Sequence, residues 1–272
     1  MRGTMRLIAA AILLQGYAWA QGPEAAVQAQ GGAGEGQGYL ELGGFTNFVN
    51  NNFGRWSGGS GKIMYKGERW APSFGFAAQR RPEGAQATFG VDSYISFNKW
   101  FYALAGVGGS PDGSAVLYPK LRYGFSGMLS LPQPRGLVAT MGASQVHGEQ
   151  GAYGRTLTAG AMYYWGRAIW SGSLSFNRSY PGAVPSKSGG LGFQYGTEGR
   201  FWIGGGMGGG RIAYQTIALR PLDVRFLTFG PNVFYQQWIS RQWGFIVKYD
   251  YQNQLDAFQR HGASASIFLE FP

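Results

Sequence analysis

The chain contains no cysteine, which excludes a disulfide framework, a thiol nucleophile and a thiolate metal site. Its two histidines, His147 and His261, lie too far apart in the sequence to form a metal-ligand motif. After residue 20, no apolar run approaches the roughly 18 residues that a transmembrane helix requires. We therefore predict no metal, no cofactor and no membrane-spanning helix.

Residues 1–20 are organised like a secretory signal peptide. Arg2 and Arg6 precede a short apolar run over 7–14, and the Ala-Trp-Ala sequence at 18–20 has the small-x-small form of a cleavage site. The apolar run is too short to span a bilayer. The sequence therefore predicts export, with cleavage after residue 20.

The mature chain is expected to gain its stability without disulfides. Residues 21–37 are small and polar and predict a flexible periplasmic leader, followed by a single domain over 38–272. Glycine (47 residues) and aromatic residues (16%) are both unusually frequent. A closed β-barrel suits such a chain, because closure pairs every backbone group of the strands.

Apolar and polar side chains alternate in segments of about ten residues from Tyr39 onward. In residues 170–177 (WSGSLSFN), for example, Trp170, Leu174 and Phe176 share one face and serines occupy the other. A soluble sandwich also alternates. Here, however, the polar faces are rich in Gly, Ser and Gln, and aromatic residues gather near segment ends, as in interfacial girdles. The pattern predicts an all-β fold, a transmembrane antiparallel up-and-down β-barrel.

The predicted strands cover residues 38–48, 60–67, 70–80, 86–97, 99–108, 115–129, 136–147, 153–166, 168–178, 187–197, 200–219, 222–239, 242–254 and 259–271. They number about fourteen, an even number as in bacterial outer-membrane barrels. Twelve strands is the alternative, if the GGGMGGG run at 204–210 is a loop or a bend. Residues 108–114 and 179–190 are predicted to be longer connections.

The terminal segment, ASASIFLEFP at 263–272, shows the same alternation. Ile267, Leu269 and Phe271 are expected to face lipid, and Glu270 to face the lumen. We expect Phe271 to lie at the periplasmic interface, where the barrel-assembly machinery recognises the last strand.

Three stretches together resemble a known family. Residues 100–129 combine an aromatic strand, a Gly/Ser loop and a strand in which Pro119 precedes basic and aromatic residues. The block at 153–165 and the final strand follow the same plan. These features resemble the YaiO family of outer-membrane β-barrels over roughly residues 38–271. Because some relatives resemble barrels at the end of exopolysaccharide secretion machines, the resemblance also implies a role in polysaccharide export.

The same alternation points a set of polar residues into the lumen: Asp92, Tyr94, Lys120, Arg122, Asp223, Arg225, Lys248, Asp250 and Glu270. Two interpretations stay open. The charges pair across the barrel and plug it, or they and Tyr94 line a hydrated path that guides a polar solute or a sugar chain. A barrel of about fourteen strands lies between packed small barrels and open porins, so its size does not decide.

Catalytic pairs are not evident in the sequence. Ser144 and His147, like His261 and Ser264, are three residues apart, which places each pair on opposite faces of a strand. We therefore predict no catalytic residues and no enzyme.

Our leading hypothesis is a conduit or export component in the outer membrane of a Gram-negative bacterium, for exopolysaccharide or another polar solute. A plugged structural or interaction barrel and a lipid-modifying enzyme are the alternatives. The formal net charge of +10 favours lipopolysaccharide phosphates, anionic lipid or an acidic polymer as partners over nucleic acid. The other expected partners are the assembly machinery and a periplasmic export protein.

Overall fold

The computed structural model describes residues 37–51, 53–111, 117–148, 151–180, 182–212, 226–255 and 258–272, without the side chains of residues 212 and 226. The predicted signal peptide and the predicted leader up to residue 36 lie outside the described residues. No helix in the described part of the chain is long and apolar enough to cross a bilayer.

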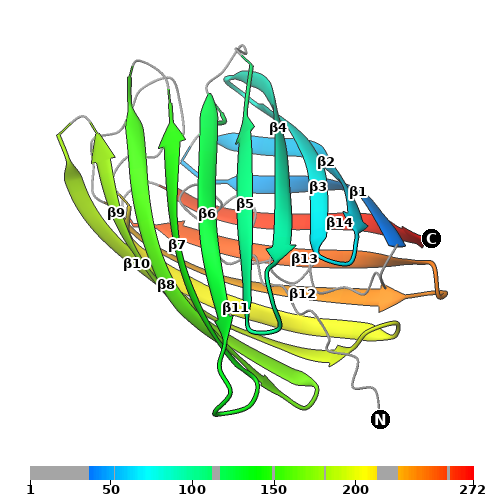
Figure 1. Cartoon of the computed structure of the whole chain (residues 1–272). Helices are drawn as coiled ribbons and strands as arrows, with labels where there is room; N and C mark the ends of the chain where they lie inside the picture. Colours follow the sequence, from blue (N-terminus) through cyan, green and yellow to red (C-terminus); the bar gives the residue numbers. More distant parts are fainter. Residues whose placement is uncertain are drawn as a thin grey trace, which may run out of the picture.

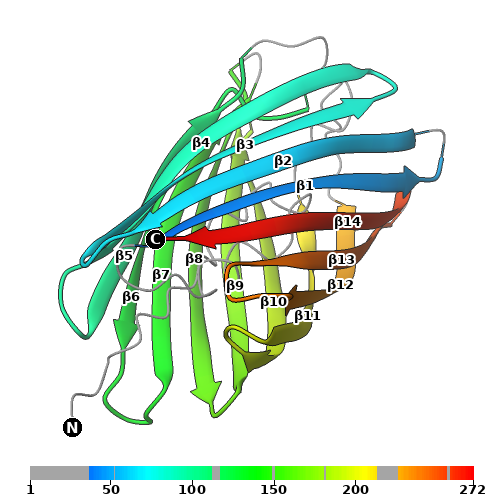
Figure 2. The ribbon, with the colours of Figure 1, turned by 90° about the vertical axis from the view of Figure 1, so that its right-hand side faces the viewer.

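The described residues form one closed antiparallel barrel of fourteen strands, with each strand hydrogen-bonded to its neighbours in the sequence (Figure 1). The barrel closes where β1 pairs with β14, from Gly38 opposite Phe271 to Val49 opposite Arg260 (Figure 2). The strands are β1 (Gln37–Val49), β2 (Gly54–Lys66), β3 (Trp70–Arg81), β4 (Gly84–Ser96), β5 (Phe101–Gly109), β6 (Leu121–Ser130), β7 (Leu137–His147), β8 (Tyr153–Trp165), β9 (Ala168–Tyr180), β10 (Val184–Thr197), β11 (Phe201–Ile212), β12 (Phe226–Trp238), β13 (Trp243–Gln254) and β14 (Phe258–Phe271).

The glycine run at 204–210 is a paired strand, so the prediction of fourteen strands is confirmed and the alternative of twelve is wrong. This run lies within β11 and pairs on one side with β10 and on the other with β12. Strand pairing uses backbone groups, so it does not require side chains. Gly204 also leaves room for a neighbour, because a Cβ atom there would lie 2.6 Å from the ring of Phe234.

Several connections differ from the predicted ones. The strand expected from residue 60 begins at Gly54, and the strand expected to end at residue 219 ends at Ile212. The segment 179–190 was expected to be a longer connection, but β9 continues to Tyr180 and β10 begins at Val184. The strand expected from residue 115 begins at Leu121. In residues 179–190 the local sequence is rich in Gly, Pro and Ser, which indicate turns. The end of a strand, however, is decided by its pairing with the adjacent strand.

The two ends of the barrel differ in the length of their connections. One end carries the start of β1 and the end of β14, and the turns there are short, such as Gly166-Arg167, where Gly166 has a positive φ of 62°. The longest connections, 110–120 and 213–225, both belong to the opposite end. Outer-membrane barrels have short periplasmic turns and longer extracellular loops. We therefore call the first end the periplasmic rim and the second the outer rim.

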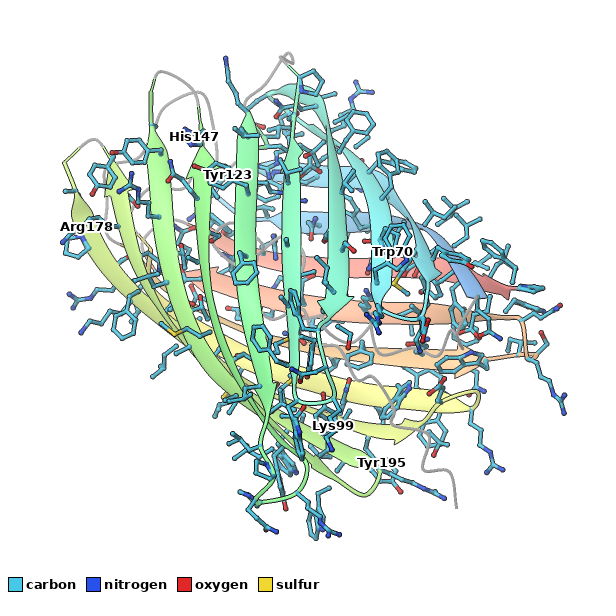
Figure 3. All side chains as sticks on the ribbon, viewed as in Figure 1. Trp70, Lys99, Tyr123, His147, Arg178 and Tyr195 are labelled. Carbon is cyan, nitrogen blue, oxygen red and sulfur yellow. The ribbon has the colours of Figure 1, made fainter. Side chains whose placement is uncertain are left out.

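Large apolar side chains cover the outside of the barrel. Exposed examples occur on every strand, and Trp70 and Tyr195 mark the half toward the periplasmic rim (Figure 3). This arrangement inverts the usual soluble pattern, because lipid rather than a protein core solvates the apolar face.

Leu174, at the centre of β9, is 63% exposed and provides a test of the lipid face. Leu174→Arg should lower the free energy of unfolding by about 2–4 kcal/mol, because it places a charge near the bilayer midplane. Urea unfolding in phospholipid vesicles measures this effect. Leu174→Ala is the control, and an equal loss for the two variants would contradict a lipid-facing position.

Candidate functional site: the barrel lumen

The inward face of the barrel contains most of the residues that the sequence placed in the lumen. Asp92 and Tyr94 on β4, Arg122 on β6, Lys248 and Asp250 on β13, and Glu270 on β14 all alternate with exposed outward neighbours. Lys120 lies before the start of β6 and is exposed, so it does not belong to the inward face of a strand. Asp223 and Arg225 lie outside the described residues. On the terminal strand, Ile267, Leu269 and Phe271 are exposed on the outer wall.

Apolar side chains line the periplasmic half of the lumen, which we call the collar. Its buried members are Tyr39, Met64, Tyr94, Tyr102, Leu104, Met128, Val138, Met162, Trp238, Ile246 and Phe268. The ring of Phe268 stacks on Tyr39 at 5.9 Å between centroids and meets Trp238 edge-on at 5.1 Å. Tyr94, expected beside a hydrated path, packs in this apolar layer instead. The collar consists of two separate packed clusters, one on β4 to β8 and the other on β12, β13, β14, β1 and β2.

Sequence reasoning missed the collar because it treated the inward face as uniformly polar. A signal was present: Met64, Met128 and Met162 all occupy inward positions near the periplasmic ends of their strands. A long, flexible apolar side chain in that position is suited to filling irregular space inside a barrel.

Carboxylates lie next to the collar and are held by neutral donors. Glu41 accepts hydrogen bonds from the Tyr39 hydroxyl at 2.8 Å and from the Ser266 hydroxyl at 2.7 Å. Glu270 accepts one from the Trp238 indole at 3.3 Å. These bonds fix the acids against the wall beside the apolar layer.

Arginines gather at the opposite, outer mouth of the lumen. Arg81 ends β3, Arg122 begins β6 and Arg260 lies near the start of β14. The guanidinium carbon of Arg81 lies 3.9 Å from the centroid of the Trp56 ring. Arg260 donates to Asp250 at 2.6 Å, and its side chain is only 5% exposed. We call Arg81, Arg122 and Arg260 the mouth arginines.

The connection between β5 and β6 is anchored to this mouth. The Gln86 side-chain oxygen accepts hydrogen bonds from the backbone N–H groups of Leu117 and Tyr118, each at 2.7 Å. Burial raises the pKa of Tyr118 to about 12, although the positive charges of Arg81 and Arg122 pull it downward. Tyr118 therefore keeps its proton at neutral pH, close enough to Arg81 and Arg122 to feel the charge of both guanidinium groups.

Amides and hydroxyls line the inward face from the level of the collar to the outer mouth, and we call this set the polar belt. Its buried members are Asn47, Gln79, Gln86, Thr88, Ser126, Thr140, Thr158, Ser175, Ser186, Gln194, Thr228, Gln236, Gln252 and Gln254. Some bond to each other, as Thr158 does to Ser175 at 2.9 Å. Within the described part of the chain, other buried groups have no hydrogen-bond partner, among them the side-chain amide of Gln254 and the hydroxyl of Thr228.

The candidate catalytic pairs are separated by the barrel wall. His147 and His261 are on the outer wall, whereas Ser144 and Ser264 point inward. His261 contacts the Tyr249 hydroxyl at 2.7 Å, and His147 contacts the Gln145 amide at 2.8 Å. Among the described residues there is no group of three or more potential metal ligands. In this geometry neither histidine can activate the serine three residues away from it.

Comparisons with known proteins agree with this architecture. The family described as YaiO membrane beta barrel domain matches residues 37–215. No curated protein matches the chain. The structure is similar to the CymD monoaromatic hydrocarbon channel, with a TM-score of 0.57 and 10% identity over 89% of this chain and 90% of that chain. It is also similar to the COG4313 outer membrane channel from Pseudomonas putida F1, with a TM-score of 0.52 and 10% identity over 89% and 97% of the two chains.

A third similar structure is a bacterial polysaccharide outer membrane secretin, with a TM-score of 0.54 and 6% identity over 88% of this chain and 99% of that chain. At such identities the likeness concerns the fold alone, which is that of outer-membrane channels and porins. The family match, in contrast, spans well over half of the chain. The protein therefore belongs to the YaiO family of membrane β-barrels.

Proposed function

We propose that this protein is a gated conduit in the outer membrane of a Gram-negative bacterium, and that its cargo is a hydroxyl-rich, acidic polymer such as an exopolysaccharide. The observation that carries the proposal is the polar belt on the inward face, in which some buried groups, such as the Gln254 amide and the Thr228 hydroxyl, have no hydrogen-bond partner among the described residues. A buried amide or hydroxyl without a partner is costly, by about 1–3 kcal/mol. A chain of sugar hydroxyls passing through the belt would supply both donors and acceptors to these groups.

The mouth arginines support an acidic cargo. Their guanidinium groups form charge-assisted, often bidentate hydrogen bonds to carboxylate or phosphate groups. The Arg122 side chain lies along the inner wall over two residues without side chains, Gly90 and Gly108. Tyr118 adds an aromatic ring beside these charges, and Trp56 supports the Arg81 guanidinium from below.

The collar would serve as the gate. Its side chains belong to the strands themselves, so rotation of a few long side chains can change the opening without unpairing the wall. A periplasmic export partner that docks at this rim would be one means of shifting the collar. The expected cargo and the expected partner belong to one process, the export of a polymer from the periplasm.

The collar also favours a second candidate, a barrel that is permanently closed and serves as a structural or interaction platform. Closure by well-packed apolar groups is expected of such a protein. The third hypothesis, a lipid-modifying enzyme, has no support from the positions of His147 and His261.

Planar-bilayer conductance of the refolded mature protein tests the conduit. We expect brief openings that an acidic polysaccharide blocks and that a neutral polysaccharide of equal length does not block. Arg122→Gln should weaken this block by about tenfold, the equivalent of about 1.4 kcal/mol. Arg55→Gln, which changes an arginine on the outer wall of β2, is the matched control.

Two outcomes would count against this proposal. Equal block by both polymers would contradict an acidic cargo. A silent membrane, with folding shown by heat-modifiable migration on a gel, would favour the closed platform.

A further inference from the structure

The outer wall carries cations but no acids on its described strands. Every carboxylate of those strands points inward: Glu41, Asp92, Asp250 and Glu270. The outward cations all lie in the half of their strands nearest the outer rim: Arg55, Arg80, Arg155, Arg178, Lys187 and Arg211. This half of the wall faces the outer leaflet, so the asymmetry indicates attraction to anionic groups in that leaflet.

The strongest concentration of this charge is on β8, β9 and β10. Arg155 and Arg178 are directly opposite each other in the pairing of β8 with β9. On β10, Pro185 pairs with Arg178, and Lys187 is the next outward residue along the strand. Like charges placed directly opposite each other destabilise a sheet. A bound anion between them would convert this repulsion into attraction.

Neighbouring side chains hold Arg155 at this level of the wall. Its Nε donates to the Gln145 side-chain oxygen at 3.2 Å, and its guanidinium carbon lies 5.5 Å from the centroid of the Tyr153 ring. Lys187 is held similarly, with its ammonium 5.6 Å from the ring of Phe176. The cationic groups are therefore oriented in advance along the wall rather than free to extend into water.

Nearer the outer rim, four rings form a continuous stack across β6, β7, β8 and β9. Ring centroids are 6.0 Å apart between Tyr123 and His147, 5.9 Å between His147 and Tyr153, and 4.3 Å between Tyr153 and Tyr180. Tyr123, His147 and Arg178 lie together toward this rim (Figure 3). Aromatic side chains therefore lie at this level of the wall, where the sugar headgroup of a lipid would contact them.

Nearer the membrane centre, the same strands expose only apolar side chains. Leu157, Leu174 and Leu191 on β8, β9 and β10 are all exposed. From the midplane outward the wall thus presents apolar groups, then cations, then stacked rings. An acylated, phosphorylated sugar likewise has its acyl chains toward the midplane and its phosphates and sugar rings beyond them.

We propose that this patch binds a phosphorylated glycolipid of the outer leaflet, with its phosphates on Arg155, Arg178 and Lys187. The acyl chains would lie along Leu157 and Leu174. This site is on the outside of the barrel, so it is independent of the cargo proposed for the lumen.

Native mass spectrometry of the full mature chain, refolded in detergent and titrated with lipid A, tests the proposal. The double variant Arg155→Gln/Arg178→Gln should bind diphosphorylated lipid A at least about tenfold more weakly than the wild type. The control, Arg167→Gln/Arg200→Gln, makes the same charge change at the periplasmic rim and should retain full affinity. Lipid A without phosphates should bind both variants and the wild type equally weakly.

Equal affinity of the two double variants for diphosphorylated lipid A would overturn the proposal. Equal displacement by phosphatidylglycerol would also overturn it, since the patch would then be a general anionic surface. If the glutamine variant fails to fold, Arg155→Lys/Arg178→Lys retains the charge but loses bidentate geometry. It should bind with intermediate affinity, and affinity equal to that of the wild type would contradict direct coordination of phosphate.

Discussion

Replacing Phe268 and Met128 together with alanine should turn a barrel that opens briefly into one that conducts steadily. Both side chains are 0% exposed, and they come from β14 and β6 on opposite walls of the barrel (Figure 1). Truncation removes a ring from one cluster of the collar and a thioether chain from the other. The backbone pairing that closes the wall does not depend on either side chain.

The cost in stability should be considerable but not prohibitive. Truncation of a buried Phe typically costs about 3–5 kcal/mol, and truncation of a buried Met about 2–5 kcal/mol. The loss should be smaller here, because water can enter the new space from the lumen.

The matched control is Leu269→Ala/Leu129→Ala. These residues are the next ones along the same two strands, and both are 45% exposed on the outer wall. We expect single-channel recordings of the control to resemble those of the wild type. If the collar variant folds and still does not conduct, the lumen is closed elsewhere and the conduit proposal fails.

Asp250→Ala should be among the most destabilising single substitutions in the lumen. It removes the carboxylate that lies 2.6 Å from the Arg260 guanidinium, and the Arg260 side chain is only 5% exposed. Breaking one side of a fully buried ion pair costs about 3–5 kcal/mol, and the loss here should lie toward or below the lower end of that range, because the Asp250 side chain is 33% exposed. Gly262 indicates how closely the site is packed, since a Cβ atom there would collide with Asp250 and Asn47.

A second substitution separates loss of the pair from loss of packing. Asp250→Ala/Arg260→Met should recover much of the stability, because no buried charge remains. Asp92→Asn is the comparison, since its hydrogen bond from the Ser73 hydroxyl at 2.8 Å is worth only about 1 kcal/mol. Urea unfolding in vesicles, followed by tryptophan fluorescence, measures all three. Equal losses for Asp250→Ala and for the double variant would show that packing, not charge, dominates.

The periodicity of the sequence by itself was enough to predict an antiparallel membrane barrel of fourteen strands. Alternation is a local property of a strand, so Leu269 and Glu270 can be assigned to opposite faces without knowledge of any neighbour. The same local reasoning separated His261 from Ser264. It was ambiguous at 204–210, where glycine removes the side chains on which the pattern depends.

Only the tertiary structure decided what each inward side chain meets. Tyr94 and Arg122 both point inward, yet Tyr94 packs in the collar and Arg122 lies at the outer mouth. Their surroundings differ because they lie at different heights along the barrel axis, where different residues of other strands surround them. Likewise, Arg155 and Arg178 are 23 positions apart in the sequence, and only the register of β8 with β9 places them opposite each other. Alternation determines the face of a residue, but strand register and barrel closure determine its neighbours, and those neighbours decide its chemistry.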